Sequence, residues 1–196
     1  MIEKMASAIV STWKKSGAIP ESDEQIYRYG AELLISTSAN LLLLIMVSIT
    51  AGCPAAFLPY LLSFIPLRLF GGGYHAKAHW SCILITVGAF SASLLLNSVL
   101  DVTSPRIFCV GVGIVSLSTI YFLAPLPAPN KPLSRKEEKS YGTVARAYGI
   151  LLLAIALILS IHGLSASPSV TLFYAGELMS TVMLIAGKLQ WKRRSN

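Results

Sequence analysis

The chain has 196 residues, of which 54% are apolar and only 13% are charged, and its mean hydropathy is +0.65. Soluble domains carry about twice that share of charged residues, so these values exclude an ordinary soluble domain and predict a membrane protein. The net charge of +7 does not predict nucleic-acid binding, because topology and anionic lipid headgroups explain basic residues at the ends of membrane spans.

The N-terminal segment predicts an amphipathic helix within residues 1–20. Its first sixteen residues interleave charged and apolar side chains, so no cleavable signal peptide is expected. Apolar residues from Ile2 to Trp13 recur at three- and four-residue spacing, while most of the charges fall elsewhere. Such a helix lies on a membrane surface or packs on the protein itself, and the sequence supports both interpretations equally.

Six stretches are read as membrane-spanning helices, since a bilayer core of roughly 30 Å needs about 20 apolar residues. The second stretch is short and contains Pro59 and Pro66 before the triplet Gly71-Gly72-Gly73, so we expect it to be kinked and then broken there. A proline-rich connection follows the fourth apolar stretch, and its charged second half is expected to begin a helix. The stretches lie near 31–51, 54–70, 81–100, 106–125, 146–163 and 169–187.

The distribution of basic residues predicts the orientation. Alternating connections place fifteen of the sixteen Lys and Arg on one side and only Arg106 on the other. Because basic residues in short connections are retained in the cytoplasm, both termini are expected to be cytoplasmic. The predicted fold is therefore all-α and polytopic, a single integral-membrane domain over 1–196. It comprises the amphipathic helix of 1–20, a six-span bundle over 31–187 and a basic tail over 188–196.

The connection from Arg68 to Cys82 concentrates reactive residue types at the expected cytosolic boundary: three glycines, two histidines, a tyrosine, a lysine and a thiol. A thiol is a poor nucleophile until it ionises, and a neighbouring imidazole can take its proton. Cys82 with His75 or His79 supplies such a pair. A cysteine at the start of an apolar span is more often a small packing residue, so these residues only nominate Cys82.

The spacing of His75, His79 and Cys82, at i, i+4 and i+7, would place all three on one face of a continuous helix, which also fits a three-ligand metal site. On that helix His75 and Cys82 would lie about 10.5 Å apart along the axis, beyond the roughly 3 Å that proton transfer requires. A dyad with His75 therefore requires non-helical chain or a bend, which the glycines allow. Cys53 and Cys109 form no CxxC spacing, so neither a zinc cage nor a disulfide framework is predicted.

Arg68, the run Gly72-Gly73-Tyr74-His75-Ala76 and Cys82 resemble the signature of the accessory gene regulator B (AgrB) family. Asn130-Lys131-Pro132-Leu133 is similar to the segment that follows the fourth span in that family. Members are cysteine endopeptidases that process the AgrD propeptide in bacterial quorum sensing. The resemblance implies Cys82 as the nucleophile, His75 as its base, no cofactor and an AgrD-like propeptide as substrate. It also implies a place in the cell membrane with the site at the cytoplasmic face, and a homodimer is suggested only by the resemblance.

The resemblance further implies that Cys82 cleaves the propeptide and holds part of it as a thioester. A cysteine or serine within the peptide then displaces Cys82, which gives a cyclic thiolactone or lactone. Main-chain N–H groups of the glycine-rich turn are candidates to stabilise the oxyanion, and nearby basic residues would match an acidic substrate tail. Candidates for oxyanion or substrate contacts are Arg68, Gly72, Gly73, Tyr74, Lys77 and Lys131.

Two other functions stay open from the residues alone. A six-span peptide transporter or exporter would need no thiol and would account for Glu177, which sits near the centre of the last span. An unpaired charge there is costly, so this carboxyl is expected to be neutral, paired or facing a polar cavity. The second alternative is a metal-dependent membrane enzyme that uses His75, His79 and Cys82.

Overall fold

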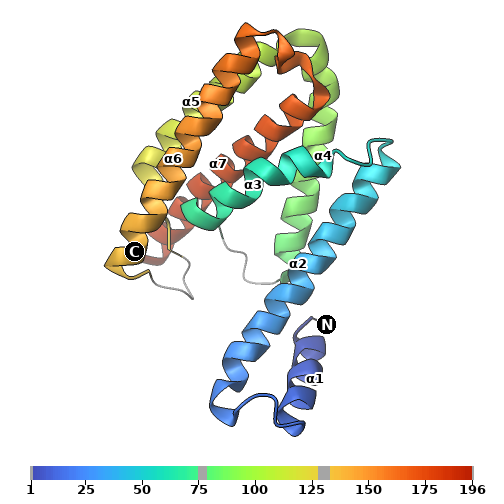
Figure 1. Cartoon of the computed structure of the whole chain (residues 1–196), viewed down its shortest axis with the longest axis vertical. Helices are drawn as coiled ribbons and strands as arrows, with labels where there is room; N and C mark the ends of the chain where they lie inside the picture. The colour runs from blue at the N-terminus through green and yellow to red at the C-terminus, as the bar shows by residue number, and fades with distance from the viewer. Residues whose placement is uncertain (1, 75–78, 128–132, 196) are drawn as a thin grey trace.

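The computed structural model describes residues 2–74, 79–127 and 133–195. Within these ranges the chain forms seven α-helices and two short 3-10 turns, and no strand (Figure 1). The all-α prediction is therefore confirmed. The helices are α1 (Ile2–Lys15), α2 (Glu24–Thr50), α3 (Phe57–Gly71), α4 (His79–Thr103), α5 (Pro105–Leu123), α6 (Arg135–Ile161) and α7 (Pro168–Ser195).

Five of the described helices, α2, α4, α5, α6 and α7, are long and apolar enough to cross a membrane, which fits a multi-pass membrane protein. Helix α3 has 15 residues and is therefore about 22 Å long, shorter than the roughly 30 Å of a bilayer core. Each predicted span corresponds to a helix, but the second does not have the length of a span. Six spans, cytoplasmic termini and a single domain over 1–196 stay predictions.

Helix α3 ends at the glycine triplet, as expected. Pro66 lies inside the helix, and Gly72, the residue after its last turn, has φ of +79°. That left-handed conformation cannot continue a right-handed helix and is open to glycine without a Cβ penalty. The break that the sequence predicts therefore lies between α3 and α4.

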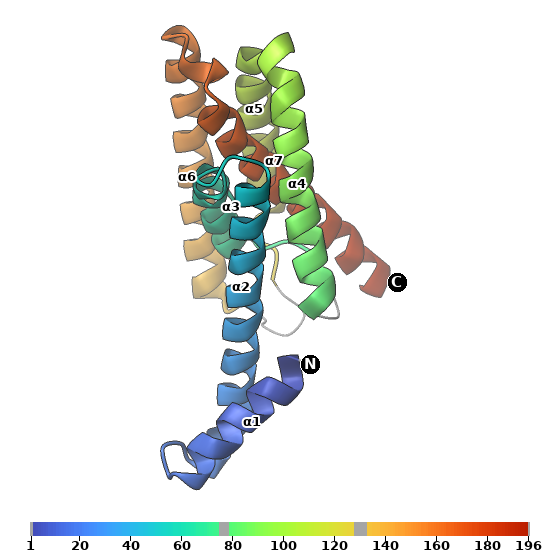
Figure 2. The same ribbon diagram turned by 90° about the vertical axis from the view of Figure 1, so that its right-hand side faces the viewer.

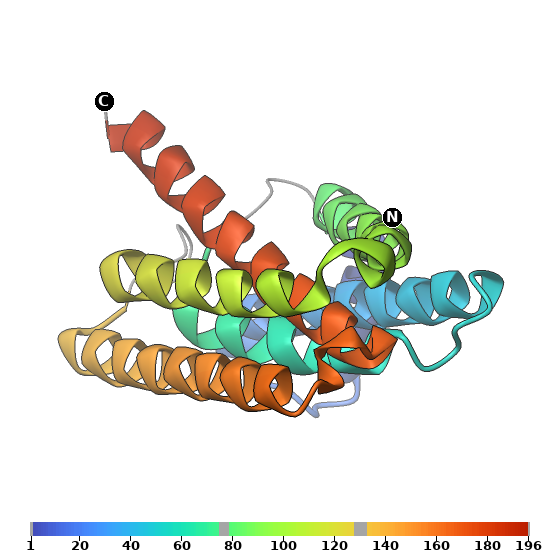
Figure 3. The same cartoon turned by 90° about the horizontal axis from the view of Figure 1, so that it is seen from above.

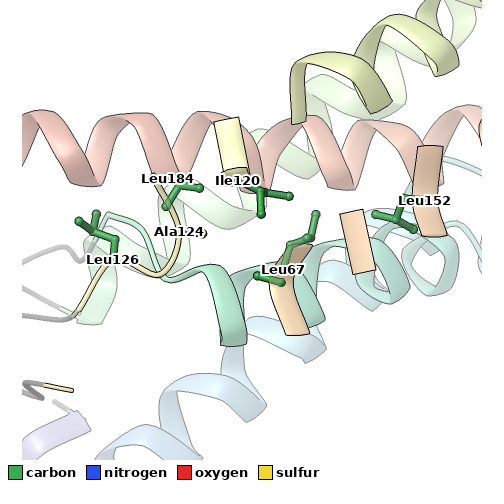
Figure 4. Packing of buried hydrophobic residues seen from close by; sticks show 7 residues of the cluster. Leu67, Ile120, Ala124, Leu126, Leu152 and Leu184 are labelled. Carbon is green, nitrogen blue, oxygen red and sulfur yellow. The ribbon is translucent and has the colours of Figure 1, made fainter. Parts of the chain in front are cut away.

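Helix α3 packs closely against α7. A Cβ at Gly176 of α7 would overlap the carbonyl oxygen of Tyr60 and lie 2.5 Å from Ser63 Oγ, so the absence of a side chain lets the two backbones meet. Ser180 Oγ donates a hydrogen bond of 3.0 Å to the carbonyl oxygen of Phe64. A core of buried residues joins α3 and α7 to α5 and α6 (Figure 4). Its members are Leu67, Ile120, Ala124, Leu126, Ala145, Leu152 and Leu184.

Helices α2 and α4 lie beside each other along the same side of α3 and α7 (Figure 2). Leu44 of α2 and Phe90 of α4 pack there with Tyr60 and Phe64 of α3 and with Leu172 of α7. Seen from above, α5 and α6 run side by side and α7 crosses between them and α4 (Figure 3). The molecule thus has a pair, α2 and α4, packed against the group formed by α3, α5, α6 and α7.

The first half of α2 extends beyond the other helices and packs against α1 (Figures 1 and 2). Ala6 and Val10 of α1 are buried in this contact. Met5, Ile9 and Trp13 lie outside it and are 48%, 38% and 40% exposed. The predicted N-terminal helix is confirmed, and its apolar residues are divided between the protein and an outer face. Contact of that outer face with lipid stays a prediction.

Helix α6 begins at Arg135, in the charged half of the connection, as predicted. Ser134 caps it: its Oγ accepts a 3.3 Å hydrogen bond from the N–H of Glu137, whose carboxylate accepts a 2.9 Å hydrogen bond from the N–H of Ser134. This capping box satisfies two N–H groups that the first turn leaves unpaired. Favourable local chemistry therefore fixes the start of α6.

Candidate active site

Cys82 lies in the first described turn of α4 and is an exposed, free thiol. It lines a cavity of about 140 Å³ between α2, α3, α4 and α7. Apolar side chains form much of the wall, and an arginine, a tyrosine, an asparagine and a threonine supply its polar groups. The lining residues are Asn40, Phe64, Arg68, Tyr74, Cys82, Ile85, Thr86 and Met183.

The glycine turn that follows α3 is held in place by main-chain hydrogen bonds. Leu126 N–H donates to the carbonyl oxygen of Gly71 over 2.9 Å, and Tyr74 N–H donates to the carbonyl oxygen of Met183 over 2.7 Å. The first bond joins the turn to the segment after α5, and the second joins it to α7. Because both partners are backbone groups of other elements, the turn has a defined position beside Cys82.

The three glycines of the turn have different roles. Gly72 and Gly73 have φ of +79° and +129°, a region that other residues rarely adopt. A Cβ at Gly72 would overlap the carbonyl oxygen of Leu126, and one at Gly73 would lie 2.8 Å from Arg68 Nη1 and 2.9 Å from the Met183 oxygen. At Gly71 a Cβ would meet only the Cβ of Ala124, at 4.0 Å. Only the second and third positions therefore require glycine.

Arg68 connects the glycine turn with Cys82. Its Nη2 donates to the carbonyl oxygen of Tyr74, and its side chain lines the same cavity as Cys82. Nη1 is buried and has no hydrogen-bond partner in the described part of the chain. A fixed cation is thus placed at the wall of the cavity, where it can stabilise negative charge on sulfur or on a substrate oxygen.

The structure brings together five of the predicted site residues, Arg68, Gly72, Gly73, Tyr74 and Cys82. The main-chain N–H of Tyr74 is bonded to Met183, so it is not free to stabilise an oxyanion. The other predicted site residues, His75, Lys77 and Lys131, lie outside the described residues, as does the side chain of His79. Their roles stay predictions.

The chain between α3 and α4 meets one requirement of the His75 dyad. Residues 72–74 are not helical and α4 is described from His79, so Gly71 to Cys82 is not one straight helix. In the described ranges no group of three or more His, Cys, Asp or Glu side chains could hold a metal ion. The alternative metal site at His75, His79 and Cys82 falls partly outside those ranges and is not tested.

Several residues of the cavity were not predicted. Asn40 of α2 is the most informative, because its Oδ1 is buried without a hydrogen-bond partner among the described residues. A polar side chain within the apolar stretch 31–51 is the sequence signal that could have indicated it. Met183 and Gly187 contribute through their backbone, as carbonyl acceptor and as a point of close approach, and no side-chain pattern reveals such roles.

Glu177 does not line the Cys82 cavity. It is 0% exposed, and neither carboxyl oxygen has a hydrogen-bond partner within the described chain. Ser116 and Thr181 form a hydroxyl pair of 2.5 Å between α5 and α7, and Thr181 Oγ1 also donates to the Glu177 carbonyl oxygen.

Comparison with known proteins decides the family. The family model described as accessory gene regulator B matches residues 2–185, nearly the whole chain. The chain belongs to the AgrB family. That family is associated with processing of the quorum-sensing autoinducer and acts with an AgrD propeptide. No curated protein and no solved structure was found to match the chain. The match to AgrB includes every residue that lines the Cys82 cavity.

Proposed function

We propose that this AgrB protein is a membrane-embedded cysteine endopeptidase that cleaves an AgrD-like propeptide, with Cys82 as nucleophile and His75 as base. One observation carries the proposal: the thiol of Cys82 is exposed in a cavity whose wall holds the Arg68 guanidinium. Most cysteines in apolar helices are buried packing residues, as Cys109 is here. An exposed thiol is accessible to a substrate, and a cation in the same cavity can stabilise the negative charge that develops during its attack.

The proposed reaction has two acyl transfers. His75 takes the thiol proton, and the Cys82 sulfur attacks the carbonyl carbon of the scissile peptide bond. The C–N bond breaks, the imidazolium returns the proton to the leaving amine, and the N-terminal part of the propeptide remains as a thioester on Cys82. A thiol or hydroxyl within that part then attacks the thioester, which forms the ring and restores the Cys82 thiol.

The walls of the cavity suit this sequence of steps. Exchange of one thioester for another is nearly isoenergetic, so the ring forms only if water does not hydrolyse the intermediate first. Phe64, Ile85 and Met183 give the cavity apolar walls, and an apolar, enclosed site limits access of water to a reactive intermediate. We place this site at the cytoplasmic face of the cell membrane.

Purified protein in proteoliposomes, incubated with a synthetic AgrD-like propeptide, tests the proposal. Cys82→Ala and His75→Ala should each abolish cleavage, whereas His79→Ala should retain it and Cys109→Ala, a change of a second thiol, should have no effect. Mass spectrometry of the quenched reaction should detect an acyl group on Cys82. Full processing by Cys82→Ala would exclude the peptidase, and loss of activity with a chelator would favour the metal enzyme.

A further inference from the structure

Two residues that line the Cys82 cavity each carry a buried polar atom, and the two atoms have opposite hydrogen-bonding character. Asn40 Oδ1, from α2, accepts hydrogen bonds, and Arg68 Nη1, from α3, donates them. Both residues line the cavity, and neither atom has a hydrogen-bond partner among the described residues. Buried polar groups are nearly always paired, and an unpaired one destabilises the fold. The two atoms therefore point to a ligand that supplies the missing acceptor and the missing donor.

The combination restricts the chemistry of that ligand. An anion would satisfy the guanidinium but would offer no hydrogen-bond donor to Asn40 Oδ1, and a cation would be repelled by Arg68. A peptide main chain offers both complements, because each residue other than proline carries one N–H donor and one C=O acceptor. A volume of about 140 Å³ corresponds to roughly ten water-sized sites, enough for a short stretch of main chain.

We infer that Asn40 and Arg68 form a clamp for the substrate main chain beside the scissile bond. Arg68 Nη1 donates to a substrate carbonyl oxygen, and Asn40 Oδ1 accepts from a substrate N–H. This inference rests on the proposed function, because it describes how the same cavity holds the peptide that Cys82 cleaves. Asn40 is accordingly a substrate-binding residue.

The clamp is preorganised on the side of Arg68. Nη2 of the guanidinium donates to the Tyr74 carbonyl oxygen, and the Tyr74 N–H donates to Met183 of α7. The glycine turn thus fixes the orientation of the guanidinium, whose Nη1 lies close to Gly73 and has no hydrogen-bond partner in the described part of the chain. A donor that is already oriented loses less entropy when the substrate binds. Asn40 contributes to the cavity lining from a different helix, α2.

Asn40→Leu tests the acceptor side of the clamp, because leucine has a similar size and no hydrogen-bonding atom. The matched control is Ser38→Leu, at an exposed position of the same helix. We expect kcat/KM for the synthetic propeptide to fall about tenfold or more in Asn40→Leu, as for a lost hydrogen bond that leaves a substrate N–H unpaired. The thermal midpoint should be unchanged or higher, because the variant removes an unpaired buried acceptor.

Ser38→Leu should match the native protein in both measurements. A native kcat/KM in Asn40→Leu would overturn the clamp, and so would a large loss of thermal stability, since that would show Asn40 to be paired within the free protein.

A second measurement identifies the hydrogen bond itself. Propeptides in which one main-chain N–H near the scissile bond is replaced by an ester oxygen lose that donor without changing a side chain. At the position that contacts Asn40, the ester should lower the kcat/KM of the native enzyme about tenfold. The same ester should leave the kcat/KM of Asn40→Leu unchanged, because a double-mutant cycle gives this result for a direct interaction. If the losses in kcat/KM caused by the ester and by Asn40→Leu add at every position, Asn40 does not bond directly to a substrate N–H.

The two proposals fail separately. If Cys82→Ala processes the propeptide as the native protein does, the peptidase fails. The clamp is then judged by the Kd of the intact propeptide, which Asn40→Leu should raise about tenfold relative to Ser38→Leu. If cleavage depends on Cys82 and the Asn40 measurements show no loss, the clamp alone is wrong.

Discussion

Gly187 of α7 lies directly against the peptide unit that joins Gly73 to Tyr74: a Cβ at Gly187 would lie 2.5 Å from the carbonyl carbon of Gly73 and 2.6 Å from the nitrogen of Tyr74. Gly187→Ala would force the glycine turn away from α7. We expect a loss of about 1–3 kcal/mol in stability, as for overpacking of a close contact, and a larger loss of cleavage. Thermal unfolding and propeptide cleavage of the purified variant are the measurements.

Gly71→Ala is the matched control for that change, since its Cβ would make only a 4.0 Å contact and its φ is not positive. It should retain activity and stability. Equal damage by Gly71→Ala and Gly187→Ala would show that the close approach to α7 is not what the turn requires.

A second pair of glycine variants measures the contact between α3 and α7. Gly176→Ala would overlap the carbonyl oxygen of Tyr60, so it should destabilise the protein by about 1–3 kcal/mol. Gly88→Ala in α4 meets nothing within 4 Å and should stabilise its helix by about 0.5–1 kcal/mol. The denaturation midpoints of both variants test this, and an unchanged midpoint for Gly176→Ala would contradict the described crossing.

Substitution of Arg68 should separate its charge from its geometry. Arg68→Lys keeps the positive charge but loses the fork that contacts Tyr74 and the cavity at once, so kcat/KM should fall about tenfold or more. Arg68→Met also loses the charge and should fall further. Steady-state kinetics in proteoliposomes gives both values. Full activity of Arg68→Met would show that the cation has no part in cleavage.

The carboxyl of Glu177 should be neutral, because an ionised carboxylate that is fully buried without a partner is strongly unfavourable. Glu177→Gln, which is neutral and nearly isosteric, should therefore change the thermal midpoint little. Glu177→Lys brings a charge into the same site and should destabilise the protein by several kcal/mol. A large loss in Glu177→Gln would indicate an ionised carboxylate with an unrecognised partner.

The expected orientation can be tested with the free cysteines. Cys53 is exposed in the connection between α2 and α3, whereas Cys82 is exposed at the start of α4, and Cys109 is buried. If α2 and α4 cross the membrane with the site in the cytoplasm, a membrane-impermeant maleimide should label Cys53 in intact cells and Cys82 only after permeabilisation. Single-cysteine variants resolved by mass spectrometry provide the readout, and the reverse pattern would invert the topology.

Apolar stretches and the residue types that begin or end helices predict most of the helices of this chain. Each of the six apolar stretches corresponds to a helix, and the glycine triplet and Ser134 lie at helix ends, because these signals depend on local chemistry. The length of α3 was less predictable. It begins at Phe57 and has 15 residues, since the chain after Gly52, another glycine with positive φ, turns before it becomes helical. Apolar composition alone does not distinguish a full span from a shorter helix packed within the bundle.

The site was predictable only in part. Spacing and resemblance nominated Arg68, the glycines and Cys82, which are close in sequence. Asn40 and Met183 join them from helices far away along the chain, and Met183 acts through its carbonyl oxygen. Contacts of this kind depend on how α2 and α7 pack, and a single sequence does not specify that packing.

The packing of α2 and α4 against the other helices has a mechanical consequence. Cys82 and Asn40 belong to that pair, while Arg68 and Met183 belong to the opposing group. The cavity therefore lies between the pair and the opposing group, and Cys82 and Arg68 line it from these two sides. A small change in the distance between the α2–α4 pair and the opposing group would alter the width of the cavity without deforming any helix. Helix α1 packs against the end of α2 that extends beyond the other helices. A force on α1 would therefore be transmitted along α2 to the cavity.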